Sequence, residues 1–331
     1  MNRFSIALAQ VAICLLASPA LADYDPLTLP KIGEPKSIEL SVVDIKRNRE
    51  IPIRVYLPVD SKPSPCVFFS HGLGGSRDGN KFLGDHLALR GYVAVFLQHP
   101  GSDDTVWKDT PLRERMKAMQ EAASAQNMVA RCEDVRDVLD QLEIWNKQVD
   151  HPLAEQMDLE QVGMSGHSFG AVTTQAVSGQ SFPLIGRRYT DKRIDAAIAY
   201  SPGVPQRGSP GNAFGSVDIP WLLMTGTKDI SLIGGQTMES RLAVYPNLPK
   251  TIARYELVLY NAEHSVFSDR SLPGDKEKRN PNHHRAILAL STAYWDAYLC
   301  KNQEALHWLT GKEAKNVLEE KDRWQFKSAE K

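Results

Sequence analysis

Residues Gln161–Ser178 read QVGMSGHSFGAVTTQAVS. The apolar run Gln161–Met164 is typical of a buried β-strand, and the run Phe169–Ser178 favours a helix. Between them, the pentapeptide GHSFG matches the pattern G-x-S-x-G, in which a serine stands on a sharp turn from strand to helix. Glycine is needed two positions away on either side because side chains there would collide within the strained turn. The pattern predicts that Ser168 is a nucleophile. The nearby Ser165 lacks this glycine spacing, and we expect it to be buried at the strand end.

A serine hydroxyl becomes a strong nucleophile when a histidine removes its proton and an acid holds that histidine in the right tautomer. Both partners are available downstream. Asp229 follows the apolar run Trp221–Thr225, and His264 follows the run Tyr255–Tyr260. The chain order Ser168, Asp229, His264 is one that serine hydrolases use. Three further acids are weaker candidates because each lies at the start of a strand or beside the histidine: Asp195, Asp218 and Glu263.

A second glycine-rich turn, SHGLGG at Ser70–Gly75, follows an apolar run that begins at Cys66. Glycines allow a backbone N–H to approach a substrate oxygen closely. We therefore expect the amides of Leu73 and Phe169 to form an oxyanion hole beside Ser168. A phosphate-binding loop is the alternative, but the sequence contains neither G-x-G-x-x-G nor G-K followed by Ser or Thr.

Short apolar runs alternate with helical patterns along the chain, which predicts an α/β fold with a mostly parallel sheet covered by helices on both faces. The expected strands are Cys66–Ser70, Tyr92–Leu97, Gln161–Met164, Ile194–Ala199, Trp221–Thr225 and Tyr255–Tyr260. The expected helices are Lys81–Arg90, Leu112–Trp145, Phe169–Ser178, Thr237–Tyr245 and Arg285–Leu299. The alternating segments Ser37–Asp44 and Ile51–Leu57 predict an antiparallel N-terminal hairpin. A polar surface helix is expected at Gln303–Lys327.

The chain has 331 residues, with 39 Lys+Arg against 40 Asp+Glu and a formal net charge of −1. This balance shows no basic excess, so nucleic acid is not an expected partner. Residues 1–22 combine Arg3, an apolar stretch from Phe4 to Leu16 and the ending Ala20-Leu21-Ala22, which predicts a cleaved signal peptide. The remaining 23–331 are expected to form one catalytic domain that is secreted or periplasmic, without a stable membrane anchor.

The chain downstream of the signal keeps three cysteines, Cys66, Cys132 and Cys300, so at least one cannot pair within the chain. None has redox or zinc spacing, and we expect buried, small apolar side chains. His283 and His284 lack a third spaced ligand, so no metal is expected. No cofactor is expected either.

Two insertions at the strand ends, Pro183–Arg193 and Gly203–Ser216, could build binding specificity. The arginines of the first could be solvated or could meet an anionic substrate group. The segment Val106–Ala125, with Met116 and Met119, could be a lid over an apolar cleft or a helix packed on the sheet. We expect His71, His99 and His167 to orient backbone at the strand ends, with contact of one of them to substrate as the alternative. Trp107, Trp221 and Phe182 could line an acyl pocket, and core packing is the favoured role for Trp221.

The sequence resembles the platelet-activating-factor acetylhydrolase and dienelactone-hydrolase-like branch of the α/β-hydrolases over roughly residues 37–300. The resemblance rests on HGLGGSR at His71–Arg77, LALRGYVAV at Leu87–Val95, the pair His99-Pro100, and GHSFG at Gly166–Gly170. It implies an α/β-hydrolase fold and a secreted carboxylic ester hydrolase without a metal. It also implies Ser168 as nucleophile, His264 as base, and the Leu73 and Phe169 amides as oxyanion donors.

The sequence departs from this family at the acid. In the acetylhydrolases the acid follows the strand after the nucleophile helix, and here that strand ends in Tyr200-Ser201-Pro202. The acid therefore moves to Asp229, as in dienelactone hydrolases and polyester-cleaving relatives. Dienelactone hydrolases proper use a cysteine nucleophile, so their activity is not implied.

The expected function is therefore hydrolysis of small-molecule, lipid or polyester carboxylic esters through an acyl-enzyme on Ser168. Amide, thioester and lactone bonds pass through the same kind of tetrahedral intermediate and remain alternatives. A non-catalytic binding protein on the same scaffold is the other alternative, which the complete set of Ser, Asp, His and oxyanion glycines argues against.

Overall fold

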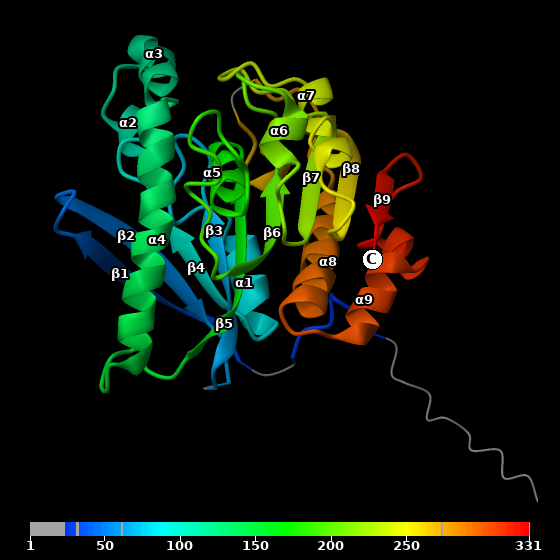
Figure 1. The fold of residues 1–331 in the computed structure, drawn as a ribbon, viewed down its shortest axis with the longest axis horizontal. Helices are drawn as coiled ribbons and strands as arrows, with labels where there is room; N and C mark the ends of the chain where they lie inside the picture. Colours follow the sequence, from blue (N-terminus) through cyan, green and yellow to red (C-terminus); the bar gives the residue numbers. More distant parts are fainter. Residues whose placement is uncertain (1–23, 31–32, 61, 273, 331) are drawn as a thin grey trace, which may run out of the picture.

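A computed structural model describes residues 24–30, 33–60, 62–272 and 274–330, so the predicted signal peptide lies outside the described residues. The described strands form one nine-stranded sheet in the order β1-β2-β4-β3-β5-β6-β7-β8-β9 (Figure 1). The strands are β1 (Lys36–Asp44), β2 (Arg49–Leu57), β3 (Ser64–Ser70), β4 (Val93–Leu97), β5 (Met157–His167), β6 (Ile194–Tyr200), β7 (Trp221–Lys228), β8 (Arg254–Glu263) and β9 (Arg323–Lys327).

Six neighbouring strands of the sheet, in the order β4-β3-β5-β6-β7-β8, pair in parallel. Antiparallel pairs join β1 to β2, β2 to β4 and β8 to β9. The mostly parallel sheet and the N-terminal antiparallel hairpin are as predicted. Because the chain crosses back between parallel strands, the carboxyl ends of β3, β5, β6, β7 and β8 all meet at one edge of the sheet.

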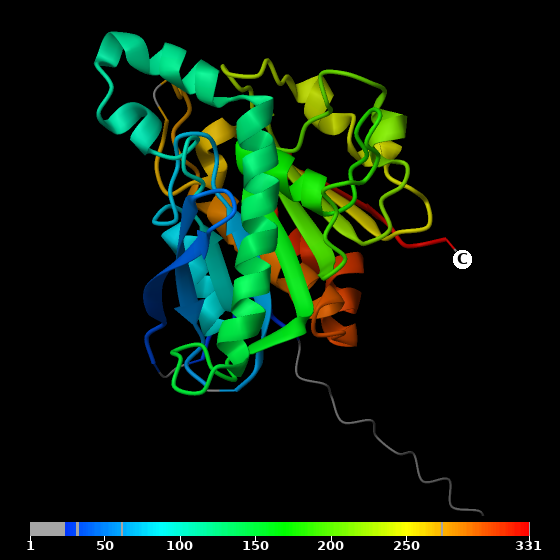
Figure 2. The ribbon, with the colours of Figure 1, turned by 60° about the vertical axis from the view of Figure 1, so that its left-hand side comes forward.

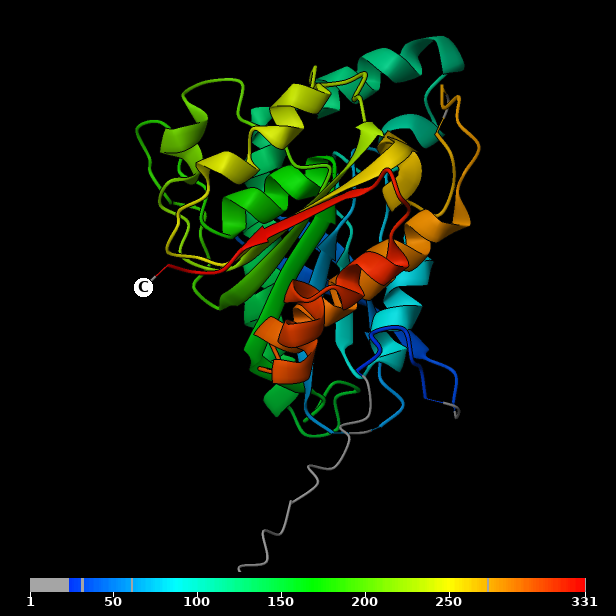
Figure 3. The same cartoon turned by 90° about the vertical axis from the view of Figure 1, so that its right-hand side faces the viewer.

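Helices cover both faces of the sheet. The helices are α1 (Lys81–Leu89), α2 (Thr105–Lys108), α3 (Leu112–Ala122), α4 (Ala125–Lys147), α5 (Phe169–Val177), α6 (Pro210–Phe214), α7 (Met238–Leu242), α8 (Pro281–Tyr298) and α9 (Gln303–Thr310), with 3₁₀ turns η1 (Tyr245–Asn247), η2 (His264–Phe267) and η3 (Glu313–Val317). Figure 2 shows α4 crossing one face of the sheet, and Figure 3 shows α8 and α9 on the other.

The alternation of side chains along each strand builds the two cores. In β3, Val67 and Phe69 pack in the core that α1 and α8 cover, whereas Cys66 and Phe68 pack in the core that α4 covers. All four side chains are buried. Both faces of β3 are therefore apolar, which explains why the strand reads as a continuous apolar run rather than an alternating one.

The C-terminal segment differs from the single polar helix predicted at Gln303–Lys327. It contains α9, η3 and then β9, which pairs antiparallel with the edge of β8. The segment RWQFK of β9 alternates, and this places Trp324 and Phe326 against Tyr255, with ring centroids 5.8 and 5.9 Å away. The prediction was wrong because the helical pattern of α9 was extended across a short alternating strand.

The single helix predicted at Leu112–Trp145 is two helices. Ser124 has an extended backbone, and its hydroxyl accepts a hydrogen bond from the Asn127 amide, so it caps the start of α4. The segment predicted as one helix at Thr237–Tyr245 is the short α7 followed by η1, whose turn contains Pro246. Both differences come from capping or proline residues inside a helical pattern.

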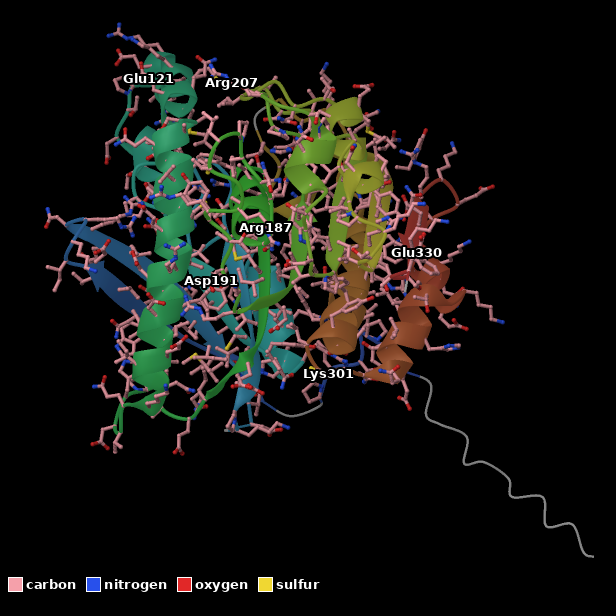
Figure 4. All side chains as sticks on the ribbon, in the orientation of Figure 1. Glu121, Arg187, Asp191, Arg207, Lys301 and Glu330 are labelled. Atoms are coloured by element: carbon pink, nitrogen blue, oxygen red, sulfur yellow. The ribbon has the colours of Figure 1, made fainter. Side chains whose placement is uncertain are left out.

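The segments between the parallel strands and their helices lie at the carboxyl edge of the sheet. Figure 4 shows Glu121 of α3 and Arg207, from the segment after β6, at this edge, whereas Lys301, which follows α8, lies at the opposite edge. Within the described residues, no helix is long and apolar enough to cross a membrane.

Candidate functional site

Ser168, His264 and Asp229 come together at the carboxyl edge of the sheet. Ser168 follows β5, Asp229 follows β7 and His264 follows β8. The Ser168 hydroxyl lies 2.8 Å from His264 Nε2, and His264 Nδ1 lies 2.6 Å from Asp229 Oδ1. The three side chains that the sequence singled out therefore form one continuous hydrogen-bonded chain. The His264 side chain, in the middle of this chain, is 14% exposed, whereas the Asp229 side chain is not exposed at all.

The turn at Ser168 has the strained backbone that the glycine pattern predicts. Ser168 has φ 58° and ψ −113°, a conformation that non-glycine residues adopt only where the surroundings enforce it. A Cβ atom at Gly170 would lie 1.8 Å from the Ser70 carbonyl oxygen, and one at Gly166 would lie 2.4 Å from the Gly170 carbonyl oxygen. No side chain fits at either glycine. Ser165 is fully buried and donates to the Phe68 carbonyl, as expected.

Asp229 is fully buried, and its carboxylate is contacted by four side chains. His264 and Arg241 contact Oδ1, while the hydroxyls of Ser201 and Thr225 donate to Oδ2 over 2.6 and 2.9 Å. Burial alone raises the pKa of Asp229, but the charge and hydrogen bond of His264, followed by Arg241 and Ser201, outweigh it and hold this pKa below its usual range. The carboxylate is therefore ionised beside His264 at neutral pH.

The three weaker acid candidates have other partners. Asp195 accepts from the Val162 amide, Asp218 pairs with Arg187, and Glu263 accepts from the amides of Lys276 and Glu277. Ser201, directly after β6, donates its hydroxyl to Asp229. Among the described acids, Asp229 alone is hydrogen-bonded to His264.

The sequence gives no indication of Arg241, whose side chain is almost completely buried behind Asp229. Its guanidinium donates to the carbonyls of Asp229, Ser201 and Pro202 over 2.7–3.0 Å, and Nη2 lies 3.0 Å from Asp229 Oδ1. One side chain of α7 thus connects the ends of β6 and β7. No local sequence signal identifies Arg241, because all of its partners come from other elements of the fold.

The glycine-rich loop lies directly against Ser168. A Cβ atom at Gly72 would lie 3.4 Å from Ser168 Cβ, so the backbone of this loop passes next to the serine. Gly74 donates to the Ser102 carbonyl over 2.9 Å and accepts from the Trp107 indole over 2.7 Å. Among the described residues, neither the Leu73 amide nor the Phe169 amide donates a hydrogen bond to a protein acceptor. Both predicted oxyanion donors are therefore available to a ligand.

Two of the three histidines around the site, His71 and His167, bond to backbone groups as expected, whereas the His99 ring bonds to the side chains of Ser70 and Asp134. His167 Nε2 donates to the His264 carbonyl, and its ring packs 4.7 Å from the His264 ring. His71 Nδ1 donates to the Gly72 carbonyl, while Nε2 accepts from the His99 amide. Burial, followed by neighbouring positive charge, lowers the pKa of all three rings, so they are neutral at neutral pH.

The segment Val106–Ala125 lies beyond the sheet, over the glycine-rich loop (Figure 2). A Cβ atom at Gly74 would lie 2.7 Å from Met119 Cε and 3.0 Å from Trp107 Cδ1, so these two side chains form an apolar wall against Gly74, the residue after Leu73. Met116 is half exposed. Away from this wall, Trp221 is buried in the core as expected, and Phe182 packs against Tyr189.

Two arginines of the first insertion, Arg187 and Arg193, are paired with acids. Arg187 binds Asp218 through both Nη atoms, and Arg193 contacts Asp140, Glu143 and Asp191. Figure 4 labels Arg187 and Asp191, which belong to the segment between α5 and β6. These contacts support the interpretation of the insertion as a solvated, structural loop.

The other predicted positions do not join the site. The cysteines Cys66, Cys132 and Cys300 are all free thiols; the first two are buried as expected, but Cys300 is exposed, so the expectation was wrong for this residue. Within the described residues, no group of three or more His, Cys, Asp or Glu side chains could hold a metal ion. A cavity of about 210 Å³ lies beside the loop after β8 and is lined in part by His283, His284 and Arg279, but not by Ser168.

The comparisons add no relative: the chain matches no protein-family model and no curated protein.

Proposed function

We propose that this protein is a serine hydrolase of the α/β-hydrolase fold that cleaves carboxylic esters through an acyl-enzyme on Ser168. The observation that carries the proposal is the hydrogen-bonded chain from Ser168 through His264 to Asp229, beside two unpaired backbone amides. This combination supplies a nucleophile, a base, an acid that orients the base, and donors for an oxyanion.

Each group has one role in the proposed reaction. As the Ser168 oxygen attacks the ester carbonyl, His264 Nε2 takes its proton, and the ionised Asp229 stabilises the imidazolium through the Nδ1 hydrogen bond. The developing oxyanion accepts hydrogen bonds from the Leu73 and Phe169 amides. His264 then returns the proton to the leaving alkoxide. Water, activated by the same histidine, releases the acid and restores the Ser168 hydroxyl.

The proposed fold rests on the arrangement of the strands. The parallel strands β3 to β8 end at the edge that carries all three side chains, and β5 leads into α5 through the strained turn at Ser168. The hairpin β1–β2 continues the sheet on the amino-terminal side. We also propose secretion or export to the periplasm, on the sequence pattern of residues 1–22 alone.

The choice of esters rests on the resemblance at His71–Arg77 and Gly166–Gly170. Amides, thioesters and lactones would use the same groups and remain the alternative substrates. A binding protein without activity would have no need of the strained Ser168 backbone or of an ionised acid buried behind the histidine.

Hydrolysis of p-nitrophenyl esters from acetate to palmitate by the chain lacking residues 1–22 tests the proposal. We expect turnover by the wild-type protein and a loss on the order of 10⁴-fold or more in Ser168→Ala, because the variant lacks the nucleophile. The matched control is Ser165→Ala, which removes a buried hydroxyl three residues away that bonds only to the Phe68 carbonyl. Equal activity of wild type and Ser168→Ala would contradict the proposal, and so would a folded wild type that hydrolyses none of the esters.

A further inference from the structure

Ser70, His99 and Asp134 form a second Ser–His–Asp chain that the proposed reaction does not use. Ser70 Oγ lies 2.9 Å from His99 Nε2, and His99 Nδ1 lies 2.9 Å from Asp134 Oδ2. Ser70 ends β3, His99 follows β4, and Asp134 lies on α4. All three side chains are fully buried, so no substrate reaches Ser70 in this structure.

The charges fix the direction of the hydrogen bonds in this chain. Burial raises the pKa of Asp134, but hydrogen bonds from His99 and Arg49 outweigh it and set the pKa at about 2. Burial, and then the charge of Arg131, lowers the pKa of His99 to about 4. At neutral pH an ionised Asp134 therefore accepts from Nδ1 of a neutral His99, and Nε2 of the same ring accepts the hydroxyl proton of Ser70.

This direction leaves the lone pairs of the Ser70 oxygen for Arg131. Arg131 Nη1 donates to Ser70 Oγ over 3.2 Å and to the His71 carbonyl over 2.8 Å. Arg131 Nε donates to Ser102 Oγ over 2.8 Å, and the Ser102 carbonyl in turn accepts from the Gly74 amide. The fully buried guanidinium is thus bonded directly to the His71 carbonyl, two residues before Leu73. Through Ser102 it is also connected to the Gly74 amide, one residue after Leu73.

Arg131 also contacts the residue that carries the second predicted oxyanion donor. Its guanidinium carbon lies 4.5 Å from the centroid of the Phe169 ring, a favourable cation–π contact. The Leu73 loop and the start of α5 therefore share one side chain as a support. The planar fork of an arginine holds several acceptors in fixed directions, which a lysine cannot do.

We propose that Arg131, oriented by the Ser70–His99–Asp134 chain, is a positioning residue that sets the Leu73 and Phe169 amides at the spacing an oxyanion requires. The inference rests on the proposed function, because it assigns an oxyanion site to these amides. Oxyanion donors act through preorganisation, so a small displacement of either amide lowers the rate while the binding of the neutral substrate changes little.

The rate of covalent phosphonylation of Ser168 by a fluorophosphonate tests the proposal without depending on ester turnover. In Ser70→Ala the oxygen that orients Arg131 is lost, and we expect labelling to slow on the order of 10-fold. Arg131→Lys keeps the positive charge but loses the planar guanidinium. We expect the labelling rate to fall further in this variant, on the order of 100-fold, which approaches the effect of losing one oxyanion donor. On any ester that is hydrolysed, kcat falls and KM stays within about 2-fold in both variants.

Thr292→Val is the matched control. It removes a hydroxyl from another buried hydroxyl–histidine pair, in which Thr292 Oγ1 lies 2.8 Å from His86 Nε2 on the opposite face of the sheet. We expect a similar loss of thermal stability in Thr292→Val and Ser70→Ala, and the wild-type labelling rate in Thr292→Val alone. If Thr292→Val slows labelling as much as Ser70→Ala does, the effect is general destabilisation and the proposal is wrong.

Peptide mapping of the label separates the remaining outcomes. Label on Ser168 with wild-type rates in both Ser70→Ala and Arg131→Lys would overturn the positioning role and leave the proposed function standing. Label on Ser70 would show that the second chain is itself reactive and would overturn the positioning role as well. A folded wild type that takes no label at any serine would overturn both proposals.

Discussion

At the scale of single residues, the described backbone positions at the carboxyl edge that have positive φ without being glycine include Asn80, Ser168, Ser201 and Asn261. Ser168 and Ser201 each follow a parallel strand, and both place a hydroxyl on the chain of groups around His264 and Asp229. Strain of this kind costs about 1–3 kcal/mol at each position and persists where the surrounding structure enforces it. The structure maintains it at the two serines that contact the proposed base and acid.

Asp229→Asn tests the assignment of the acid. The amide cannot provide the negative charge that stabilises the imidazolium, and it presents a donor toward His264 Nδ1, so we expect kcat to fall on the order of 10⁴-fold. Glu263→Gln is the control, because Glu263 lies next to the histidine in sequence but accepts only from backbone amides of the following loop. Ester hydrolysis by both variants is the measurement. Comparable losses in the two would contradict the assignment.

At the scale of elements, the short helices α2 and α3 stand between the glycine-rich loop and solvent. Trp107 of α2 donates to the Gly74 carbonyl, and Met119 of α3 lies against the same residue. Arg115 holds its guanidinium 5.6 Å from the Trp107 ring. The wall against Gly74 is therefore built from α2 and α3 rather than from the sheet. We propose that in the ester reaction this wall limits the size of the acyl group.

Trp107→Ala tests this role. Removing the indole widens the space beside Gly74, so we expect the ratio of kcat/KM for long-chain over short-chain p-nitrophenyl esters to rise on the order of 10-fold. Trp107→Phe keeps most of the apolar wall and loses the hydrogen bond to Gly74, and it should stay close to the wild-type ratio. If the two variants change the ratio equally, the hydrogen bond to Gly74 matters rather than the size of the wall.

The sequence predicted the strands, the hairpin and the three side chains of the site because each depends on local patterns. Apolar runs mark the buried strands, and the glycine spacing around Ser168 marks a turn that tolerates no other residue. The sequence contains a helix-capping serine at Ser124 and an alternating strand pattern at Arg323–Lys327. Both were overlooked because the residues around them have helical patterns. Arg131 and Arg241 could not be predicted, because their partners lie on other elements and come together only in the fold.

At the scale of the whole molecule, buried histidines make stability depend on pH. Burial, followed by nearby positive charge, lowers the pKa of His71, His86, His99 and His167, whereas in the unfolded chain each ring titrates near its ordinary value. Below about pH 6.5 the unfolded chain binds protons that the folded protein does not take up, so the free energy of unfolding falls as the pH falls. The protein should therefore lose stability in mildly acidic solution.

His86 allows this to be tested away from the proposed site, because it lies on α1 and contacts α8. Its pKa is lowered from 6.5 to about 4, so it accounts for a loss of about 3 kcal/mol between those pH values. Urea unfolding of His86→Gln should show a correspondingly shallower dependence on pH than the wild type over this range. Identical slopes in the two proteins would contradict the account of a buried, neutral His86.

The most direct test of the central claim is the identification of the acylated residue. Wild-type protein is mixed with p-nitrophenyl acetate, quenched in acid during the first turnover, digested, and mapped by mass spectrometry. We predict an acetyl group on Ser168 in the wild type, and none at this position in Asp229→Asn quenched at the same time, because its acylation is slower. Release of p-nitrophenol at an enzymatic rate with the acetyl group on another residue, or with Ser168 unmodified throughout, would contradict the claim.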